Sequence, residues 1–213
     1  IDSVGLITAR AGIVVSAGVV TVTDGYIDVS DSIRNTRIGS NAGDSFSGTD
    51  ATDNTLIGYD AGTAITTGDD NVAVGAYALT ANTTGASNVA VGKDALLANT
   101  TANNSTAVGT DALTTNSTGV SNTGIGANAL QLNTTGNYNV AVGANSLVAN
   151  TTAINNTAIG YEALKANTTG SYNTAVGKGA LDANTTGIYN AVLGYNALDA
   201  NTTGEDNTAI GSH

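Results

Sequence analysis

The sequence predicts an all-β protein, a parallel β-solenoid or β-roll built from coils of 17 residues. From Asn54 onward the chain repeats one 17-residue unit without insertion or deletion, and such a fixed period is typical of repeat architectures. The unit reads roughly N-T-A-V-G-x-x-A-L-x-A-N-T-T-G-x-x, and its Gly, Thr and Asn disfavour helices. Its length suits two short extended runs closed by two turns. Each unit is therefore expected to form one coil.

Composition excludes several classes of function. The 213 residues contain no Cys, Met, Pro or Trp, and the single histidine is His213, so a cysteine zinc site and a histidine triad are not expected. The net charge is −11, and six scattered basic residues make no phosphate-binding patch, so no nucleic-acid partner is predicted. No apolar run approaches the roughly 20 residues of a membrane helix, and no insertion into a membrane is expected. Because Met is absent, we expect an internal piece of a longer polypeptide.

The chain divides into three parts. Residues 1–34 hold short β-branched runs broken by glycine and Asp-Gly, and are predicted to form an all-β N-terminal segment. Asn35 opens a first copy of the unit, but 19 residues separate it from Asn54, so residues 35–53 are predicted to form an irregular first coil. Residues 54–213 then form a β-solenoid of nine full repeats and a partial tenth.

Two positions of the unit, counted from Asn54 as position one, are predicted to supply its core. Position four is always a branched aliphatic residue and is expected to face a core, and position nine is almost always Leu. Positions eight and eleven are mostly Ala, which indicates a narrow interior. The predicted core residues are Val74, Leu79, Val91, Leu96, Val108, Leu113, Ile125, Leu130, Val142, Leu147, Ile159, Leu164, Val176, Leu181 and Leu198.

Strand alternation adds an open question about this core. Side chains at positions two and four point one way and position three, mostly Ala, points the other. One of these faces meets the coil interior and the other could meet another chain, and the pattern does not say which is which. Since so thin an interior contributes little burial for each ordered coil, association of chains is expected to bury a further surface.

Glycine and asparagine are predicted to shape the turns and the stacking. Gly stands at position five in every copy and at position fifteen in most, where turns need positive φ or close backbone approach. Asn at positions one and twelve would lie about 4.8 Å from its own copies and form amide ladders. Thr at positions thirteen and fourteen would form hydroxyl rows. The turn and ladder residues include Gly75, Asn82, Gly92, Asn99, Gly177 and Asn184.

Three sets of side chains are candidates for binding. Asn-Thr-Thr or Asn-Ser-Thr begins at position twelve in eight copies, from Asn82 to Asn201, and is formally a glycosylation acceptor, but a turn and ladder role is favoured. Asp44, Asp50 and Asp53 could hold a cation, although their spacing favours a solvated acidic loop. Exposed tyrosines could contact a glycan receptor or simply stack along the surface: Tyr138, Tyr172 and Tyr189 at position seventeen, and Tyr59, Tyr161 and Tyr195 at position six. No catalytic, cofactor-binding or metal residue is predicted, and the chain is not expected to be an enzyme.

The repeat resembles two groups of proteins. Residues 156–170, Asn-Thr-Ala-Ile-Gly-Tyr-Glu-Ala-Leu-Lys-Ala-Asn-Thr-Thr-Gly, look like repeats of bacteriophage tail fibres. Residues 2–13 are similar to segments of marine phage, especially cyanophage, structural proteins. The core Asn-x-Ala-Val/Ile-Gly also resembles the head repeat of trimeric autotransporter adhesins, whose coils are generally shorter and lack Asn-Thr-Thr-Gly. The resemblance implies a homotrimer of parallel, left-handed β-rolls.

These observations lead to one expected function and two alternatives. The resemblance favours a rigid shaft of a trimeric phage tail or virion fibre, located in the virion, with other tail proteins and a host glycan or protein receptor as partners. The first alternative is the head of a trimeric adhesin on a bacterial cell surface. The second is a monomeric ice-binding solenoid, which is weakened because adjacent threonines in an extended run point to opposite faces.

Overall fold

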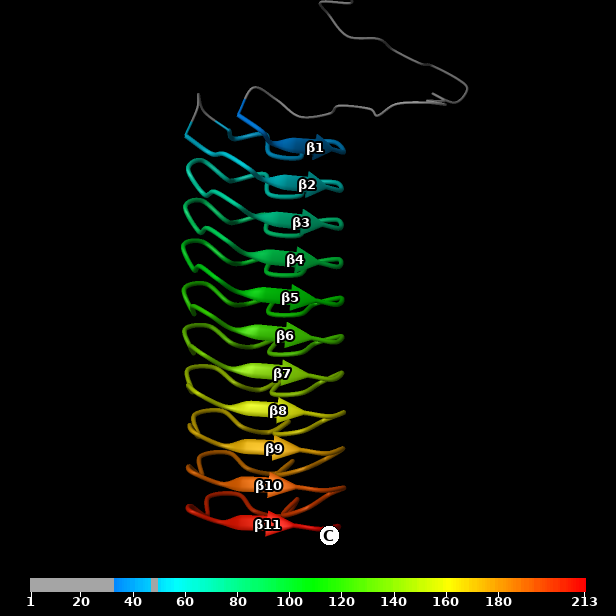
Figure 1. The fold of residues 1–213 in the computed structure, drawn as a ribbon, viewed down its shortest axis with the longest axis vertical. Coiled ribbons are helices and arrows are strands. Elements are labelled where there is room, and N and C mark those ends of the chain that lie inside the picture. Colours follow the sequence, from blue (N-terminus) through cyan, green and yellow to red (C-terminus); the bar gives the residue numbers. More distant parts are fainter. Residues whose placement is uncertain (1–32, 47–49) are drawn as a thin grey trace, which may run out of the picture.

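A computed structural model describes residues 33–46 and 50–213 as a single parallel sheet of eleven strands that follow one another in sequence order. Figure 1 shows them stacked as the rungs of a rod, with one connecting loop on either side of each rung. The strands are β1 (Thr36–Ile38), β2 (Thr55–Ile57), β3 (Val72–Val74), β4 (Val89–Val91), β5 (Thr106–Val108), β6 (Thr123–Ile125), β7 (Val140–Val142), β8 (Thr157–Ile159), β9 (Thr174–Val176), β10 (Ala191–Leu193) and β11 (Thr208–Ile210).

The strand register follows the repeat. Val89 pairs with Thr106, exactly one unit further along, whereas Thr36 pairs with Thr55 across the longer first coil. The predicted β-solenoid of 17-residue coils is thus confirmed, and Asn35 does open a coil. Ten steps of about 4.8 Å give the stack a length of roughly 48 Å. The predicted all-β segment 1–34 falls outside the described residues except for its last two.

Each coil contains one strand, so the expectation of two extended runs per coil is wrong. Positions six to eleven form turns, because the residues at positions seven and nine adopt positive φ, as in Asp94 (58°) and Leu96 (51°). Left-handed residues cannot belong to an extended run. This side of the coil still bonds to the next one, with Leu96 N donating to Ala112 O at 3.0 Å. Neighbouring coils are therefore hydrogen-bonded on both sides of the rod.

The leucines at position nine form the interior, as predicted, but in an unexpected backbone conformation. From Leu79 to Leu181 every one of them is fully buried, and Leu198 is partly buried against the same cluster. All have φ near +50°, a region that costs an ordinary residue about 1 kcal/mol. In the first two coils glycine takes this position, at Gly43 and Gly62. Burial of the side chain offsets the cost where leucine is present.

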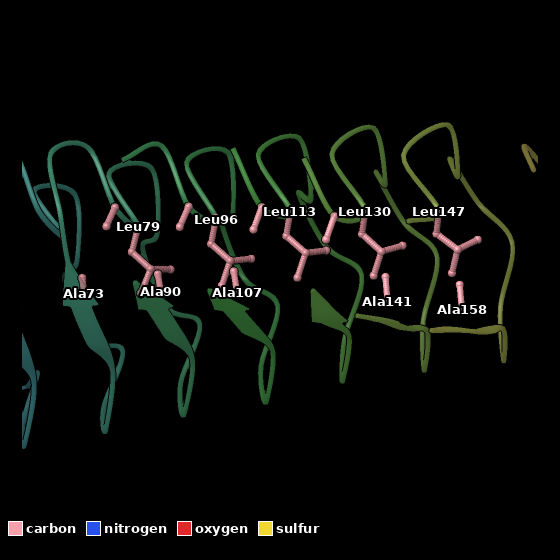
Figure 2. Packing of buried hydrophobic residues seen from close by; sticks show 14 of the residues in the cluster. Ala73, Leu79, Ala90, Leu96, Ala107, Leu113, Leu130, Ala141, Leu147 and Ala158 are labelled. Carbon is pink, nitrogen blue, oxygen red and sulfur yellow. The ribbon is translucent and has the colours of Figure 1, made fainter. Parts of the chain in front are cut away.

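Position four does not line the coil interior, which corrects one half of the predicted core. The residues that face outward instead are Val74, Val91, Val108, Ile125, Val142, Ile159 and Val176, all of them partly or well exposed. Position three is turned inward, because the pleat sends alternate side chains to opposite faces. Ala73, Ala90 and their equivalents are fully buried there, and Figure 2 shows the leucines reaching from the turn side toward these alanines.

The second coil fills its interior in another way. Position nine is Gly62 in this coil, and the missing volume is supplied by Leu56 at position three and Ile65 at position twelve. Both are fully buried, and their methyl groups lie against Gly62, 2.8 Å from where a Cβ would stand. Total core volume is thus kept while the residues that provide it change places.

Two internal asparagine ladders run along the rod, as predicted. Asn82, Asn99 and Asn184 at position twelve are fully buried, and Asn99 Nδ2 donates to Asn82 Oδ1 at 2.8 Å. At position one, Asn71 Oδ1 accepts the backbone N–H of Asn88 at 3.0 Å. Both ladders also donate to the carbonyl at position fifteen, and no buried side-chain nitrogen or oxygen of the described residues lacks a hydrogen-bond partner.

The position-one ladder has one weak rung, at Ser105, which predicts a stabilising substitution. Its hydroxyl lies 3.5 Å from Gly119 O and 3.3 Å from Asn122 N, longer than the 2.8 and 3.0 Å that Asn139 makes to the equivalent atoms. We expect Ser105→Asn to raise the free energy of unfolding by about 1 kcal/mol by restoring these bonds. Denaturant unfolding followed by circular dichroism measures it, with Thr118→Asn on the surface as control. A loss of stability would mean that the site cannot accept the amide.

Candidate interaction surface

One broad face of the rod is formed by the side chains at positions two and four, and we call it the strand face. Every one of these residues from Thr36 to Ile210 is uncharged, although the chain carries a net charge of −11. Position four is always Val, Ile or Leu, with Ile159 40% and Leu193 50% exposed. Because exposed apolar patches of this extent are typical of interaction sites, the strand face is the candidate interaction surface.

Two columns of side chains border the strand face. Column seventeen consists of the residues two before each strand, and column six of the residues two after it. All column-seventeen residues in the described coils have positive φ, as in Tyr138 at 58°. This conformation turns the chain into the strand from the loop before it. The columns therefore lie on opposite edges of the same face.

The predicted surface tyrosines lie in these columns. Tyr172 and Tyr189 stack on each other, with ring centroids 5.1 Å apart and planes 17° apart. Tyr138 lies two coils earlier, with Asn155 between it and Tyr172 in the column, and is 57% exposed. The structure thus brings two of the three together and leaves the third apart. Since Tyr172 and Tyr189 cover one face of each other, that face cannot stack on a sugar ring.

Column six holds a second cluster, formed by the predicted tyrosines Tyr161 and Tyr195 and by Lys178, which was not among the predicted residues. Lys178 Nζ lies 5.9 Å from the ring centroid of Tyr161 and 5.6 Å from that of Tyr195. Tyr195 in turn packs edge-on against His213 at 5.5 Å. The lysine is therefore held between two aromatic rings by cation–π attraction. The 17-residue spacing of Tyr161, Lys178 and Tyr195 could have revealed the cluster.

Charged groups on the surface form local pairs. Arg34 bonds both oxygens of Asp53 at 2.5 Å, and this hydrogen bond lowers the pKa of the Asp53 carboxyl. Lys165 Nζ donates to Glu162 Oε1 at 2.8 Å and lowers the pKa of the Glu162 carboxyl in the same way. These pairs lie on the surface, where such contacts contribute little to stability. No group of acidic or histidine ligands that could hold a metal ion occurs within residues 33–46 and 50–213.

The pKa of the Asp182 carboxyl is raised above its ordinary value of 3.8, mainly by burial and further by Glu162 and Asp199, while Lys165 opposes the shift. The folded state therefore holds its proton more tightly than the unfolded state, so ionised Asp182 costs stability above its folded pKa. That cost disappears as the pH falls below about 3.8.

We expect Asp182→Asn to raise the free energy of unfolding near pH 7 by about 0.4 kcal/mol, a small figure because solvent screens the charge. The gain should shrink toward zero as the pH is lowered below 3.8. Urea unfolding at a series of pH values checks this, with Glu205→Gln, an exposed residue, as the control for net charge. A gain that is independent of pH would contradict the electrostatic cause.

The asparagines of the Asn-Thr-Thr turns are not accessible for glycosylation in the folded chain. Asn82, Asn133 and Asn184 are fully buried in the ladder, so their amides are not available to a modifying enzyme. The two threonines differ: Thr134 Oγ1 bonds to Thr151 O at 3.0 Å, whereas Thr135 is exposed. One threonine row is therefore engaged with the backbone and one faces solvent, which does not provide the flat double array that an ice-binding face needs.

The part of the chain that the structure describes contains no pocket and no helix of the length and hydrophobicity required to cross a membrane. Comparison with models of known families, with curated proteins and with solved structures found no match. The strand face and its two bordering columns form the candidate functional surface of the described residues.

Proposed function

We propose that this chain is a stiff shaft segment of a fibre in which several parallel copies, three in the favoured arrangement, bury their strand faces against one another. The resemblance of the repeats to phage tail fibres supports a place in a phage tail or virion. There the shaft would hold a host-binding element away from the particle. The observation that carries the proposal is the uncharged, apolar strand face that continues along all eleven strands.

The partner for this face must match its periodicity. Branched aliphatic side chains recur every 17 residues along the rod at the spacing of adjacent strands. A second copy of this chain carries the same repeat at the same spacing, so contacts made at one coil are made again at every other coil. A partner without that repeat would match only a few coils. Self-association of parallel copies therefore suits the face best.

Stiffness follows from the hydrogen bonds between coils. Each coil donates to the next at the strand, as from Val89 N to Ser105 O at 2.9 Å, and on the turn side, as from Ala98 N to Thr114 O at 2.9 Å. Bending the rod in any direction must stretch bonds on one of these sides. Burial of three strand faces in one bundle would resist bending further.

The native mass of the folded chain in solution tests the proposal. Three copies would give about 63 kDa, three times the chain mass of 20.9 kDa, by light scattering on a sizing column. Val142→Lys should reduce the mass to that of a single chain while the fold is kept, because this side chain points outward. Thr135→Lys, away from the strand face, is the matched control. A wild-type chain that stays monomeric at all concentrations would overturn the proposal.

A further inference from the structure

Each strand has one residue of each bordering column at its own level. Tyr172 precedes β9 and Lys178 follows it, while Tyr189 precedes β10 and Tyr195 follows it. In a closed ring of parallel copies related by rotation about an axis along the rod, column seventeen of every copy meets column six of its neighbour. Rotation about that axis leaves the position of every residue along the rod unchanged. Residues that flank the same strand therefore come together across each seam.

We propose that column seventeen of each copy packs in register against column six of the next copy, with Tyr172 against Lys178 and Tyr189 against Tyr195. The inference rests on the proposed self-association of the strand face, and it adds where the seam between copies lies and which side chains close it. It holds for any closed ring of parallel copies, whatever their number. A shift of one coil at every seam would leave the ring open, so closure requires the in-register pairing.

In the in-register pairing no charged residue of one column faces a charged residue of the other. Column six carries Lys178 and Lys93, the latter paired with Asp94 of its own copy, and no acidic residue, whereas column seventeen carries Arg34 followed by Asp53, Asp70 and Asp206. A seam formed by two copies of column seventeen would place acidic side chains opposite each other. Pairing column six with column seventeen avoids this repulsion in a chain whose net charge is −11. The charge pattern thus places no like charges together at the seam that the symmetry requires.

The aromatic side chains are already ordered for such a contact within one copy. The Tyr172 and Tyr189 rings are stacked, and Lys178 is held between Tyr161 and Tyr195. Tyr172 and Tyr189 are 45% and 53% exposed, so they retain surface that a neighbour can bury. Side chains that are fixed before association lose little further freedom when they bind. Across the seam, Lys178 would gain the Tyr172 ring of the adjacent copy as another cation–π partner.

Disulfide trapping tests the geometry, since the chain has no cysteine of its own. Ser121→Cys and Ala127→Cys in one chain flank β6, with all tyrosines retained. Within a copy they lie at opposite ends of β6, whose three extended residues alone span about 10 Å, beyond the reach of a disulfide. Mild oxidation should therefore link different copies into a covalent ring with the native mass. The matched control, Ser121→Cys with Ala76→Cys, is displaced by three coils or about 14 Å and should stay unlinked.

A double-mutant cycle tests the contact between Tyr172 and Lys178 of adjacent copies. Tyr172 and Lys178 lie at opposite ends of β9 within one copy, so any coupling between them must act across a seam. We expect Tyr172→Ser and Lys178→Ala to weaken association by less in combination than the product of the single effects, with a discrepancy of roughly threefold per seam. Dissociation on dilution, followed by native mass, measures it.

The outcomes separate this inference from the proposed function. An oligomer in which the matched cysteines stay unlinked, or link no better than the displaced pair, would overturn the seam and leave self-association intact. Strictly multiplicative effects of Tyr172→Ser and Lys178→Ala on association would overturn the contact between these two residues. A monomeric wild type would overturn self-association, and the seam with it.

Discussion

Replacing Asn139 by alanine is expected to lower the free energy of unfolding by about 3 to 4 kcal/mol, although the residue is polar and lies in no binding site. Its Nδ2 donates to Ala153 O at 2.8 Å, and its Oδ1 accepts the backbone N–H of Asn156 at 3.0 Å. Alanine leaves that N–H buried without a partner and weakens the bonding of the carbonyl. Each buried group that loses its partner costs about 1 to 3 kcal/mol.

The loss can be measured both globally and at the site. Denaturant unfolding gives the free energy, and hydrogen exchange should show that the Asn156 amide loses protection first, because a repeat array can open locally. Asn139→Ser should cost less, since the chain itself carries a serine at this position, Ser105. Thr135→Ala on the surface is the matched control and should be nearly neutral. A loss below about 1 kcal/mol for Asn139→Ala would contradict a structural role of the ladder.

The second large effect is expected at Gly143, where alanine should cost about 3 kcal/mol or more. The residue has φ +133°, a conformation open to glycine alone. A Cβ there would stand 2.5 Å from Gly160 O and 2.6 Å from its carbonyl carbon, so the next coil would have to move away. Position five therefore needs glycine for two reasons, its backbone conformation and the close approach of the next coil.

Gly124→Ala is the matched control, and its effect should have the opposite sign. Gly124 occupies the inward-facing position three, has no positive φ, and a Cβ would meet Ala129 O at 3.1 Å and Leu113 Cγ at 3.3 Å. Neighbouring coils hold alanine in the same place, as at Ala107 and Ala141. We expect a gain of about 0.5 to 1 kcal/mol, measured as for Gly143→Ala. Equal losses at the two sites would show that the backbone conformation at Gly143 is not the cause.

Much of the local structure could be predicted because repetition makes the pattern visible. The ladder residues Asn82, Asn99 and Asn184, the turn glycines Gly75, Gly92 and Gly177, and the buried leucines were all predicted in their roles, and the structure bears these predictions out. A 17-residue period without insertion or deletion predicts stacked coils, because a parallel stack places equivalent residues of neighbouring coils at hydrogen-bonding distance.

Two features could not be predicted from the pattern. Position four was predicted to face a core, with strand alternation leaving open which face is inward, whereas the structure buries position three and turns Val142 and its equivalents outward. Alternation assigns side chains to two faces, but only the path of the rest of the coil decides which face it covers. The second feature is the positive φ of leucines such as Leu96, which an amino acid of this type rarely adopts.

The sequence by itself determined the fold class, the coil length, the ladders and the position-five turns, because each of these depends on which residue recurs at which spacing. Only the tertiary structure decided that each coil holds one strand, that Ala73 rather than Val74 faces the interior, and that Tyr172 and Lys178 flank one strand from opposite edges of an apolar face. These three features depend on the path that the turns impose on the rest of the coil. The side of a strand that the returning loop covers becomes core, and the opposite side becomes the surface available to a partner.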